Sequence, residues 1–323
     1  MTYRAGMSPL PSPAPRGGPA RPRGRPLCSW RAVLALVPAL ALLGCPSREA
    51  GPRPVTGVEA PRPRAISPSP ALVELVYAIG AGPHLVGVSR FCSEPEAARA
   101  LPRVGGMIDP NLEAVDALAP DLLLVQGRNE ALNELARRRD FAVHTFELET
   151  LADVNAALRR LGALFGREEQ AAQEAARLER ALAGARAQAP PDPPRTLIVF
   201  GHRAGELGQV SCPGPGTFVA ECLRAAGGVG VVDDLAPRSW HVVSKEALFE
   251  RAPELIIELH PDPVDGETAE ALRADWSGLE GIPAVASGRI AIVSGSDVLI
   301  PGPRLDRLVG KLARAVRGER DLR

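Results

Sequence analysis

Three histidines carry the side chains best suited to metal chemistry in this sequence. His202, His241 and His260 all fall in its second half, at or near the ends of segments expected to be strands. Imidazole is a common ligand of transition metals, so three such rings at one site could bind a metal ion or the metal of a chelate. Their irregular spacing favours solvent-facing or structural histidines, and the metal site stays open as an alternative.

The spacing of the cysteines does not support a zinc-binding or redox motif. Cys28 and Cys45 lie near the start of the chain, and Cys92, Cys212 and Cys222 lie in its body. No CxxC pair occurs, so neither a zinc knuckle nor a thioredoxin-type motif is supported. In an oxidising compartment two of the three body cysteines could form a disulfide, or all three could be buried as small apolar side chains.

Enzyme signatures are missing from the sequence. It contains no GxSxG, HExxH or Walker A motif. Gly214, Pro215 and Gly216 begin like a dinucleotide-binding turn, but the third glycine of GxGxxG is absent. We therefore expect a protein that is not an enzyme, with no catalytic residue, no resident metal and no cofactor.

The first 44 residues have the pattern of an export signal. They hold six arginines and no acidic residue, and an apolar run of twelve residues covers 32–43. Such a run is too short to span a bilayer, where about 20 residues are needed, and suits a secretory signal. The run ends Leu-Leu-Gly-Cys, which resembles the bacterial lipobox and predicts a lipidated Cys45. An uncleaved anchor or an ordinary signal peptide is the alternative.

Residues 45–63 read as a tether, because prolines recur among Gly and Arg and favour an extended spacer. Pro46 follows the cysteine where Asp would hint at inner-membrane retention, so the outer membrane is mildly preferred. The whole chain has 38 basic and 38 acidic residues. Without residues 1–44 the balance is 32 against 38, which argues against nucleic-acid binding.

The body of the chain alternates strand and helix patterns, which argues for parallel sheets. We expect an N-terminal lobe over 64–150 and a C-terminal lobe over 191–323. Expected strands cover 64–67, 84–89, 121–126, 141–147, 195–201, 242–244, 254–260 and 289–294. Expected helices cover 70–79, 112–118, 130–139, 217–226, 245–251 and 304–317, and 201–215 is expected to be a Gly-rich loop.

One long helix is expected to join the lobes over 151–190. The segment is free of proline up to Pro190 and rich in Ala, Leu, Arg and Glu. Nearly forty helical residues would extend about 55 Å, or less if Gly166 breaks the helix.

Several segments together resemble a known family. They are RAISPSPALVELVYAIGAGPHLVGVSRFCSEPEAARALPRVGG, DPNLEAVDALAPDLLLV, GPGTFVAECLRAAGG, VSKEALFERAPELII and GPRL, in this order over 64–317. They resemble the periplasmic binding proteins of ABC importers for vitamin B12, iron-siderophores and haem. The resemblance implies an α/β fold with two Rossmann-like lobes, parallel sheets and one backbone helix, the class III architecture, with limited hinge motion.

The resemblance also implies where the ligand binds. In this family the ligand lies between the lobes, against loops at the carboxyl ends of the strands. We therefore expect six ligand-binding residues: Phe91, Met107, Gln126, His202, Trp240 and His241. Phe91, Met107 and Trp240 align with positions where B12-binding members place aromatic rings, although Met107 departs from the aromatic type. A packing role is the alternative for Trp240.

The expected ligand is a metal chelate, cobalamin or another corrinoid first. An iron-siderophore or haem receptor, or direct metal capture by the histidines, is the alternative, as is an enzyme or sensor that reuses the fold. Tyr77 is the only tyrosine after the leader, which argues modestly against haem. The expected partners are an ABC permease with its ATPase, met through Glu113 and Glu221, and the membrane through Cys45, with the protein a monomer.

Overall fold

The computed structural model describes residues 62–323, which belong to one compact unit. The expected leader over 1–44, the lipidated Cys45 and nearly all of the 45–63 tether lie outside the described residues. Within the described part, no helix is long and apolar enough to cross a membrane.

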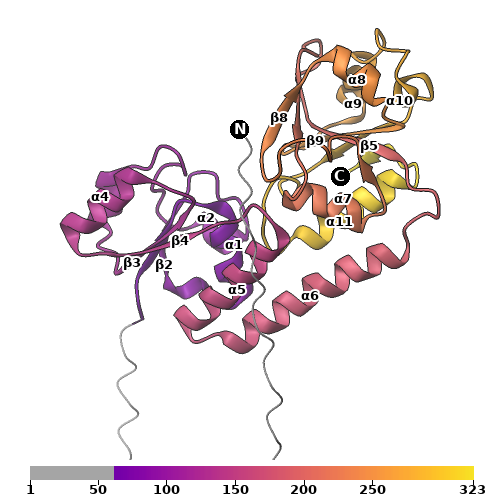
Figure 1. The fold of residues 1–323 in the computed structure, drawn as a ribbon. Helices are drawn as coiled ribbons and strands as arrows, with labels where there is room; N and C mark the ends of the chain where they lie inside the picture. Colours follow the sequence, from indigo (N-terminus) through magenta and orange to yellow (C-terminus); the bar gives the residue numbers. More distant parts are fainter. Residues whose placement is uncertain (1–61) are drawn as a thin grey trace, which may run out of the picture. The chain divides into compact units, whose positions relative to one another are not determined.

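The N-terminal lobe is a parallel sheet in the order β2-β1-β3-β4, with helices on both faces (Figure 1). Its strands are β1 (Ala65–Ser67), β2 (Leu85–Val88), β3 (Leu122–Gln126) and β4 (Ala142–Phe146). Its helices are α1 (Pro70–Ala78), the short 3-10 helix η1 (Gly82–His84), α2 (Glu96–Arg99), α3 (Leu112–Ala117) and α4 (Glu130–Arg139). Alternate residues of the apolar β3 pack on opposite faces, Leu124 toward α1 and Leu123 toward α3 and α4, as strand geometry requires.

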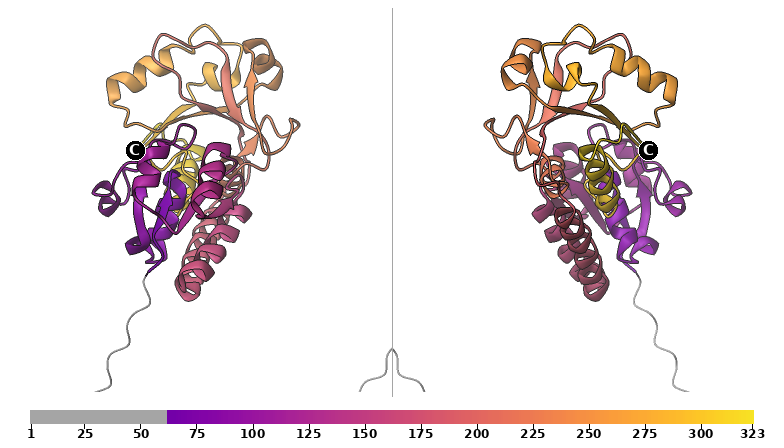
Figure 2. Two further views of the ribbon diagram at one scale, coloured as in Figure 1. Left: turned by 90° about the vertical axis from the view of Figure 1, so that its left-hand side faces the viewer. Right: turned by 90° about the vertical axis from the view of Figure 1, so that its right-hand side faces the viewer.

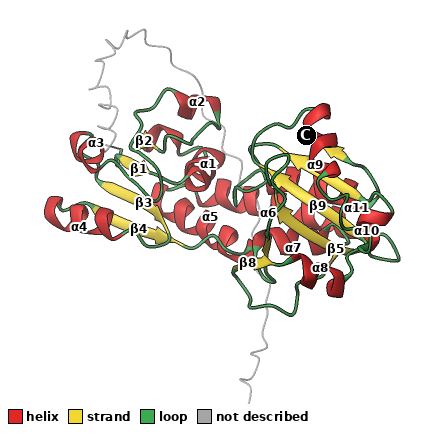
Figure 3. Cartoon of the chain, turned by 90° about the horizontal axis from the view of Figure 1, so that it is seen from above, coloured by secondary structure: helices red, strands yellow, loops and turns green. Residues whose placement is uncertain are grey.

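The C-terminal lobe is a second parallel sheet, in the order β11-β10-β9-β5-β7. Its strands are β5 (Arg195–Phe200), β7 (Val229–Gly230), β9 (Leu255–His260), β10 (Ile290–Ser294) and β11 (Asp321–Leu322). Its helices are α7 (Phe218–Ala225), α8 (Lys245–Arg251), α9 (Gly266–Ala274), α10 (Pro283–Ala286) and α11 (Leu305–Val316). The two sheets form separate groups of strands with α1, α5 and α6 between them (Figure 3).

A small antiparallel sheet corrects one expectation for this lobe. β6 (Val210–Pro213) pairs with β8 (Trp240–Val243), so the expected loop over 201–215 contains a strand, and the strand expected over 242–244 begins two residues earlier. The pairing is non-local, which is why the Gly-rich sequence around β6 did not reveal it.

The linking helix is shorter than the expected span of 151–190. Two helices occupy this segment, α5 (Leu151–Phe165) and α6 (Glu168–Ala187). Gly166 lies between them with φ +63°, the left-handed conformation that ends a helix. The 20 residues of α6 extend about 30 Å. This helix packs against α1, α5, α7 and α11, and Figure 2 shows α5 and α6 as two pink helices side by side.

The two lobes share one apolar core. Buried side chains of α1, α5, α6, α7 and α11 form a continuous cluster that joins the inner faces of both sheets. Separate clusters cover the outer faces, under α3 and α4 in the first lobe and under α8, α9 and α10 in the second. The shared core joins the two lobes through α6 and its neighbours.

Candidate ligand-binding site

A cavity of about 540 Å³ lies at the carboxyl ends of strands from both lobes. The residues after β2, the last residue of β3 and the loop after β10 contribute to it, together with the first turn of α1. Its lining residues are Pro70, Ala71, Arg90, Phe91, Met107, Ile108, Asp109, Gln126, Leu299, Ile300 and Pro301. Switch points of this kind, where strands end and helices begin, commonly form binding crevices in α/β proteins.

Three of the six expected ligand-binding residues meet in this cavity. Phe91 and Met107 are exposed apolar side chains, with Phe91 63% exposed. Gln126 ends β3, and its Oε1 accepts a hydrogen bond of 2.6 Å from the Ser69 hydroxyl. Large apolar groups left in contact with water, beside one fixed amide, indicate a surface that binds a partly apolar ligand.

A tight turn forms part of the rim of the cavity on the first lobe. Gly105 has φ +86°, and a Cβ there would lie 2.5 Å from the Asn111 amide nitrogen, so only glycine fits. The turn brings Asp109 to Arg90, whose Nη2 donates to Asp109 Oδ2 at 2.6 Å. This hydrogen bond lowers the pKa of Asp109. The Arg90 guanidinium also lies 4.8 Å from the centre of the Phe91 ring.

The second lobe supplies an apolar wall that the sequence did not single out. Leu299, Ile300 and Pro301 face the cavity from the loop after β10. The sequence placed this loop near the ligand, but its individual side chains carried no chemical signal. Together, the two walls suit a large ligand with apolar faces better than a bare metal ion.

Trp240 lies outside this cavity. It stands on β8 with 40% of its surface exposed, and its ring stacks on Phe200 with centroids 4.1 Å apart. Val242, two residues along the same strand, is also exposed. The structure therefore places Trp240 on an apolar surface of the second lobe, in contact with Phe200.

His202 and His241 lie outside the strand-end cavity. His202 is largely buried, with Nε2 2.9 Å from Asp275 Oδ2 and Nδ1 3.4 Å from Glu258 Oε2. The His241 ring lies elsewhere, with Nε2 2.9 Å from the carbonyl of Ala236. Both rings are engaged within the lobe, and neither lines the cavity.

The three-histidine metal site is likewise not formed. His260 joins His202 at Glu258, with Nε2 3.1 Å from Glu258 Oε2, whereas His241 belongs to the separate turn at Ala236. Over residues 62–323, no group of three or more His, Cys, Asp or Glu side chains is arranged to hold a metal ion.

Glu258 is the centre of a buried polar cluster. It lies within β9, fully buried, and accepts a hydrogen bond of 2.5 Å from Trp276 Nε1. Burial raises the pKa of Glu258, but His202 and His260 outweigh this effect and the pKa is lowered overall. Burial likewise opposes protonation of His202, and the contact with Glu258 prevails, so its pKa is raised. The cluster thus favours a carboxylate–imidazolium pair that stabilises the lobe.

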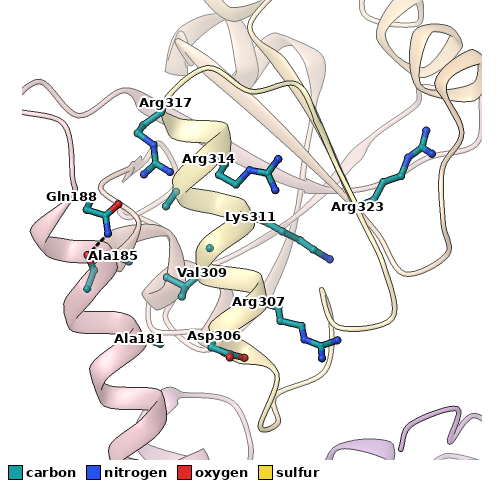
Figure 4. A pocket seen from close by; sticks show the side chains of 13 residues that line it. Ala181, Ala185, Gln188, Asp306, Arg307, Val309, Lys311, Arg314, Arg317 and Arg323 are labelled. Carbon is teal, nitrogen blue, oxygen red and sulfur yellow. Dashed lines mark hydrogen bonds between the residues drawn. The ribbon is translucent and has the colours of Figure 1, made fainter. Parts of the chain in front are cut away.

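A second cavity of about 530 Å³ runs between α6 and α11 (Figure 4). Its lining includes Ala181 and Ala185 of α6 and Arg307 and Arg317 of α11. It contains none of the expected ligand residues and lies along helices rather than at strand ends. The cavity at the strand ends is therefore the better candidate for the ligand.

The family of this chain follows from the comparison with known sequences. The periplasmic binding protein family matches residues 66–295, most of the described part. The chain belongs to the periplasmic binding protein family. Its strand-end cavity thus occupies the place expected for solute binding, and its relatives are binding proteins rather than enzymes.

Similar members of this family are known from several organisms. A cobalamin-binding protein of Halobacterium salinarum is 27% identical over 262 residues, which cover 78% of this chain and 69% of that protein. A vitamin B12-binding protein of Pectobacterium carotovorum is 30% identical over 203 residues, covering 60% and 70%. A solved periplasmic haem-binding protein of Pseudomonas aeruginosa is 26% identical, with a TM-score of 0.65 and coverage of 78% and 92%.

The two carboxylates expected to meet the permease differ in their surroundings. Glu113 is exposed at the second position of α3. Glu221 is only partly exposed, and its Oε2 accepts a hydrogen bond of 2.7 Å from the Leu151 amide at the start of α5. Glu221 therefore stabilises a helix N-terminus inside this periplasmic binding protein and is not a free surface carboxylate.

Glu246 of the second lobe, which the sequence did not single out, is placed as Glu113 is in the first lobe. It is exposed at the second position of α8, as Glu113 is in α3. Asn111 and Ser244 cap the two helices in the same way, each accepting from the amide three residues on. The signal was present in the segment VSKEALFERAPELII, where the acidic residue follows a Ser cap.

The three body cysteines form no disulfide. Cys92, Cys212 and Cys222 are free and buried. Burial raises the pKa of Cys92 to about 11. These thiols therefore serve as small apolar side chains of the core.

Proposed function

We propose that this protein is a lipid-anchored receptor that captures a corrinoid-class metal chelate and delivers it to the permease of an ABC importer. The observation that carries the proposal is the strand-end cavity, because both lobes contribute apolar walls to it and Gln126 adds one fixed amide. Cobalamin combines a broad macrocycle with many amide groups, and such a surface matches these walls. The cobalamin- and B12-binding relatives support the same ligand class.

Family membership makes the chain an exported, periplasmic protein. The lipid anchor at Cys45 is part of the proposal and rests on the sequence alone. The basic, acid-free leader and the Leu-Leu-Gly-Cys segment support it. The preferred location is the outer membrane, and the expected form is a monomer.

Ligand titration of the purified full chain in detergent tests the ligand class. We expect cyanocobalamin to raise the melting temperature and to bind saturably. Truncation by Phe91→Ala with Met107→Ala should weaken binding by about 1–2 kcal/mol, roughly 5- to 30-fold. Phe249→Ala is the matched control, because Phe249 is an exposed phenylalanine outside the cavity. Absence of any response to cobalamin or cobinamide would exclude the corrinoid ligand.

An anionic chelate such as haem or a ferric siderophore is the second candidate. Arg90 at the rim of the cavity favours it, since its guanidinium could turn from Asp109 to a carboxylate of the ligand. The haem-binding structure of similar fold supports this alternative. Hemin and a ferric catecholate in the same titration distinguish the classes, and Arg90→Gln should weaken binding only of an anionic ligand.

A further inference from the structure

A buried ion pair joins the two lobes directly behind the cavity. Glu74 of α1 and Arg304 at the start of α11 are 230 residues apart in the sequence. Arg304 Nε donates to Glu74 Oε2 at 2.8 Å, and Nη2 donates to Oε1 at 2.6 Å. The side chains are only 5% and 14% exposed. This two-point geometry fixes both the distance and the orientation between the two helices.

Each residue of the ion pair follows a cavity-lining residue by three positions in the sequence. Pro70 and Ala71 in the first turn of α1 line the cavity, and Glu74 lies in the next turn. Pro301 lines the opposite side, and Arg304 follows three residues later. The ion pair therefore connects the wall of one lobe with the wall of the other.

Arg304 also holds the loop that carries the second wall. Its Nη1 donates to the Ser296 hydroxyl at 2.8 Å and its Nη2 to the Ser296 carbonyl at 2.9 Å. Close by, Lys311 Nζ donates to Asp297 Oδ1 at 2.8 Å. The loop that contains Leu299, Ile300 and Pro301 is thus held near its start by two cations.

A buried ion pair of this kind is costly, because the desolvation of two charges offsets much of their attraction. A gain in net stability is therefore a weak explanation for this ion pair. Its position between the two lobes explains it better. It bridges the lobes at the single loop that completes the cavity.

We propose that Glu74 and Arg304 form an inter-lobe latch that positions the 299–301 wall for ligand binding. The inference rests on the proposed receptor function and assigns to these two residues a positioning role without ligand contact. Without the latch, the loop samples positions that leave the cavity open, and the population competent to bind falls.

The test compares two variants of the full chain with the wild type. Glu74→Gln removes the charge of one partner. Glu74→Met with Arg304→Met removes both charges and keeps apolar volume, so it should stay folded, since such replacements of buried pairs are often neutral or stabilising. Arg314→Gln is the matched control, because Arg314 lies on the same helix but pairs with Glu319 at the surface.

We expect the double variant to keep its melting temperature while cyanocobalamin affinity falls about tenfold, as for a competent population reduced to about a tenth. Hydrogen–deuterium exchange should become faster over residues 295–302 and stay unchanged at the 105–110 turn. The control should match the wild type in both measurements. A folded double variant with wild-type affinity and wild-type exchange would overturn the latch.

The exchange measurement needs no ligand and separates this inference from the receptor proposal. If the wild type binds no chelate but Glu74→Gln, which keeps the Arg304–Ser296 hydrogen bonds, exchanges faster over 295–302, the ligand class is wrong and the latch stands. If the wild type binds cobalamin and neither measurement responds to the double variant, the latch is wrong and the receptor function stands.

Discussion

The buried carboxylate of Glu258 engages the neighbouring rings of His202 and His260. A glutamate in the middle of the apolar strand LIIELH must find partners when it is buried, because an unpaired charge there is very costly. His202, His260 and Trp276 are those partners in the structure. The sequence contains this buried glutamate, but it does not show which side chains pair with it, because His202 and Trp276 lie in loops outside β9.

The charge pair at Glu258 should make stability depend on pH. The pKa of Glu258 is lowered from 4.5, so its contribution is present above pH 4.5 and lost as pH falls through the folded-state pKa. The pKa of His202 is raised from 6.5, so its contribution is present below pH 6.5 and lost as pH rises through the folded-state pKa. The pair therefore stabilises the fold most between these two values.

We expect Glu258→Gln to lower the free energy of unfolding by about 3 kcal/mol in this window, as for a broken buried pair. The loss should shrink toward both acid and neutral pH. Urea unfolding at a series of pH values measures it, and Glu267→Gln, an exposed glutamate of α9, is the control. A loss that is independent of pH would mean that the charges of the cluster do not determine its stability.

At the scale of elements, the corner between α5 and α6 shows where local propensity stops being informative. The Ala- and Leu-rich composition favours one helix, and a glycine inside it costs only about 1 kcal/mol, so Gly166 alone leaves both outcomes possible. Tertiary packing decides between them. A Cβ on Gly162 of α5 would lie 2.8 Å from the Ala171 Cβ of α6, so the two helices turn back and pack closely there.

Two glycines of this segment should respond in opposite directions to alanine. Gly166→Ala forces an L-residue into the left-handed conformation and should cost about 1 kcal/mol of stability. Gly184→Ala fills open space inside α6 and should stabilise by up to about 1 kcal/mol. Thermal unfolding of both variants measures the pair of effects. Stabilisation by Gly166→Ala would show that the chain can continue as one helix.

The elements that the sequence predicted well are those with local signals. The apolar runs at β3, β9 and β10 predict buried strands, and the helices expected over 112–118 and 217–226 match α3 and α7, which Asn111 and Thr217 cap. The β6–β8 sheet has no such signal, since Gly- and Pro-rich segments separate its partners. The same limit applies to the site. Phe91 follows a strand and Gln126 ends one, so the sequence could place both near the ligand, whereas Leu299 reaches the cavity only through the tertiary fold.

At the scale of the whole molecule, the shared core and the Glu74–Arg304 pair both connect the lobes. The core runs through α6, and the ion pair lies nearer the cavity. The two lobes are therefore linked at two places, within the core and beside the cavity. We propose that the permease recognises the loaded protein through residues carried on each lobe.

We propose that Glu113 and Glu246 are the residues that meet the permease. Both are exposed, and both occupy the second position of a short helix capped by Asn or Ser, one on each lobe. Hydrogen bonds from the Glu246 backbone and from Ser244 lower the pKa of Glu246, which keeps it charged. Exposed charges of this kind contribute mainly to the rate and register of docking.

Charge reversal should therefore separate docking from binding. Glu113→Arg and Glu246→Arg should each reduce chelate uptake in cells by on the order of tenfold or more, with ligand affinity of the purified chain unchanged. Glu267→Arg, an exposed reversal on α9, should leave uptake intact. Glu221→Arg should instead lower the melting temperature, because it places a cation at the N-terminus of α5. Wild-type uptake by the Glu246 variant, or a loss of ligand affinity in either docking variant, would contradict this assignment and return Glu221 to consideration.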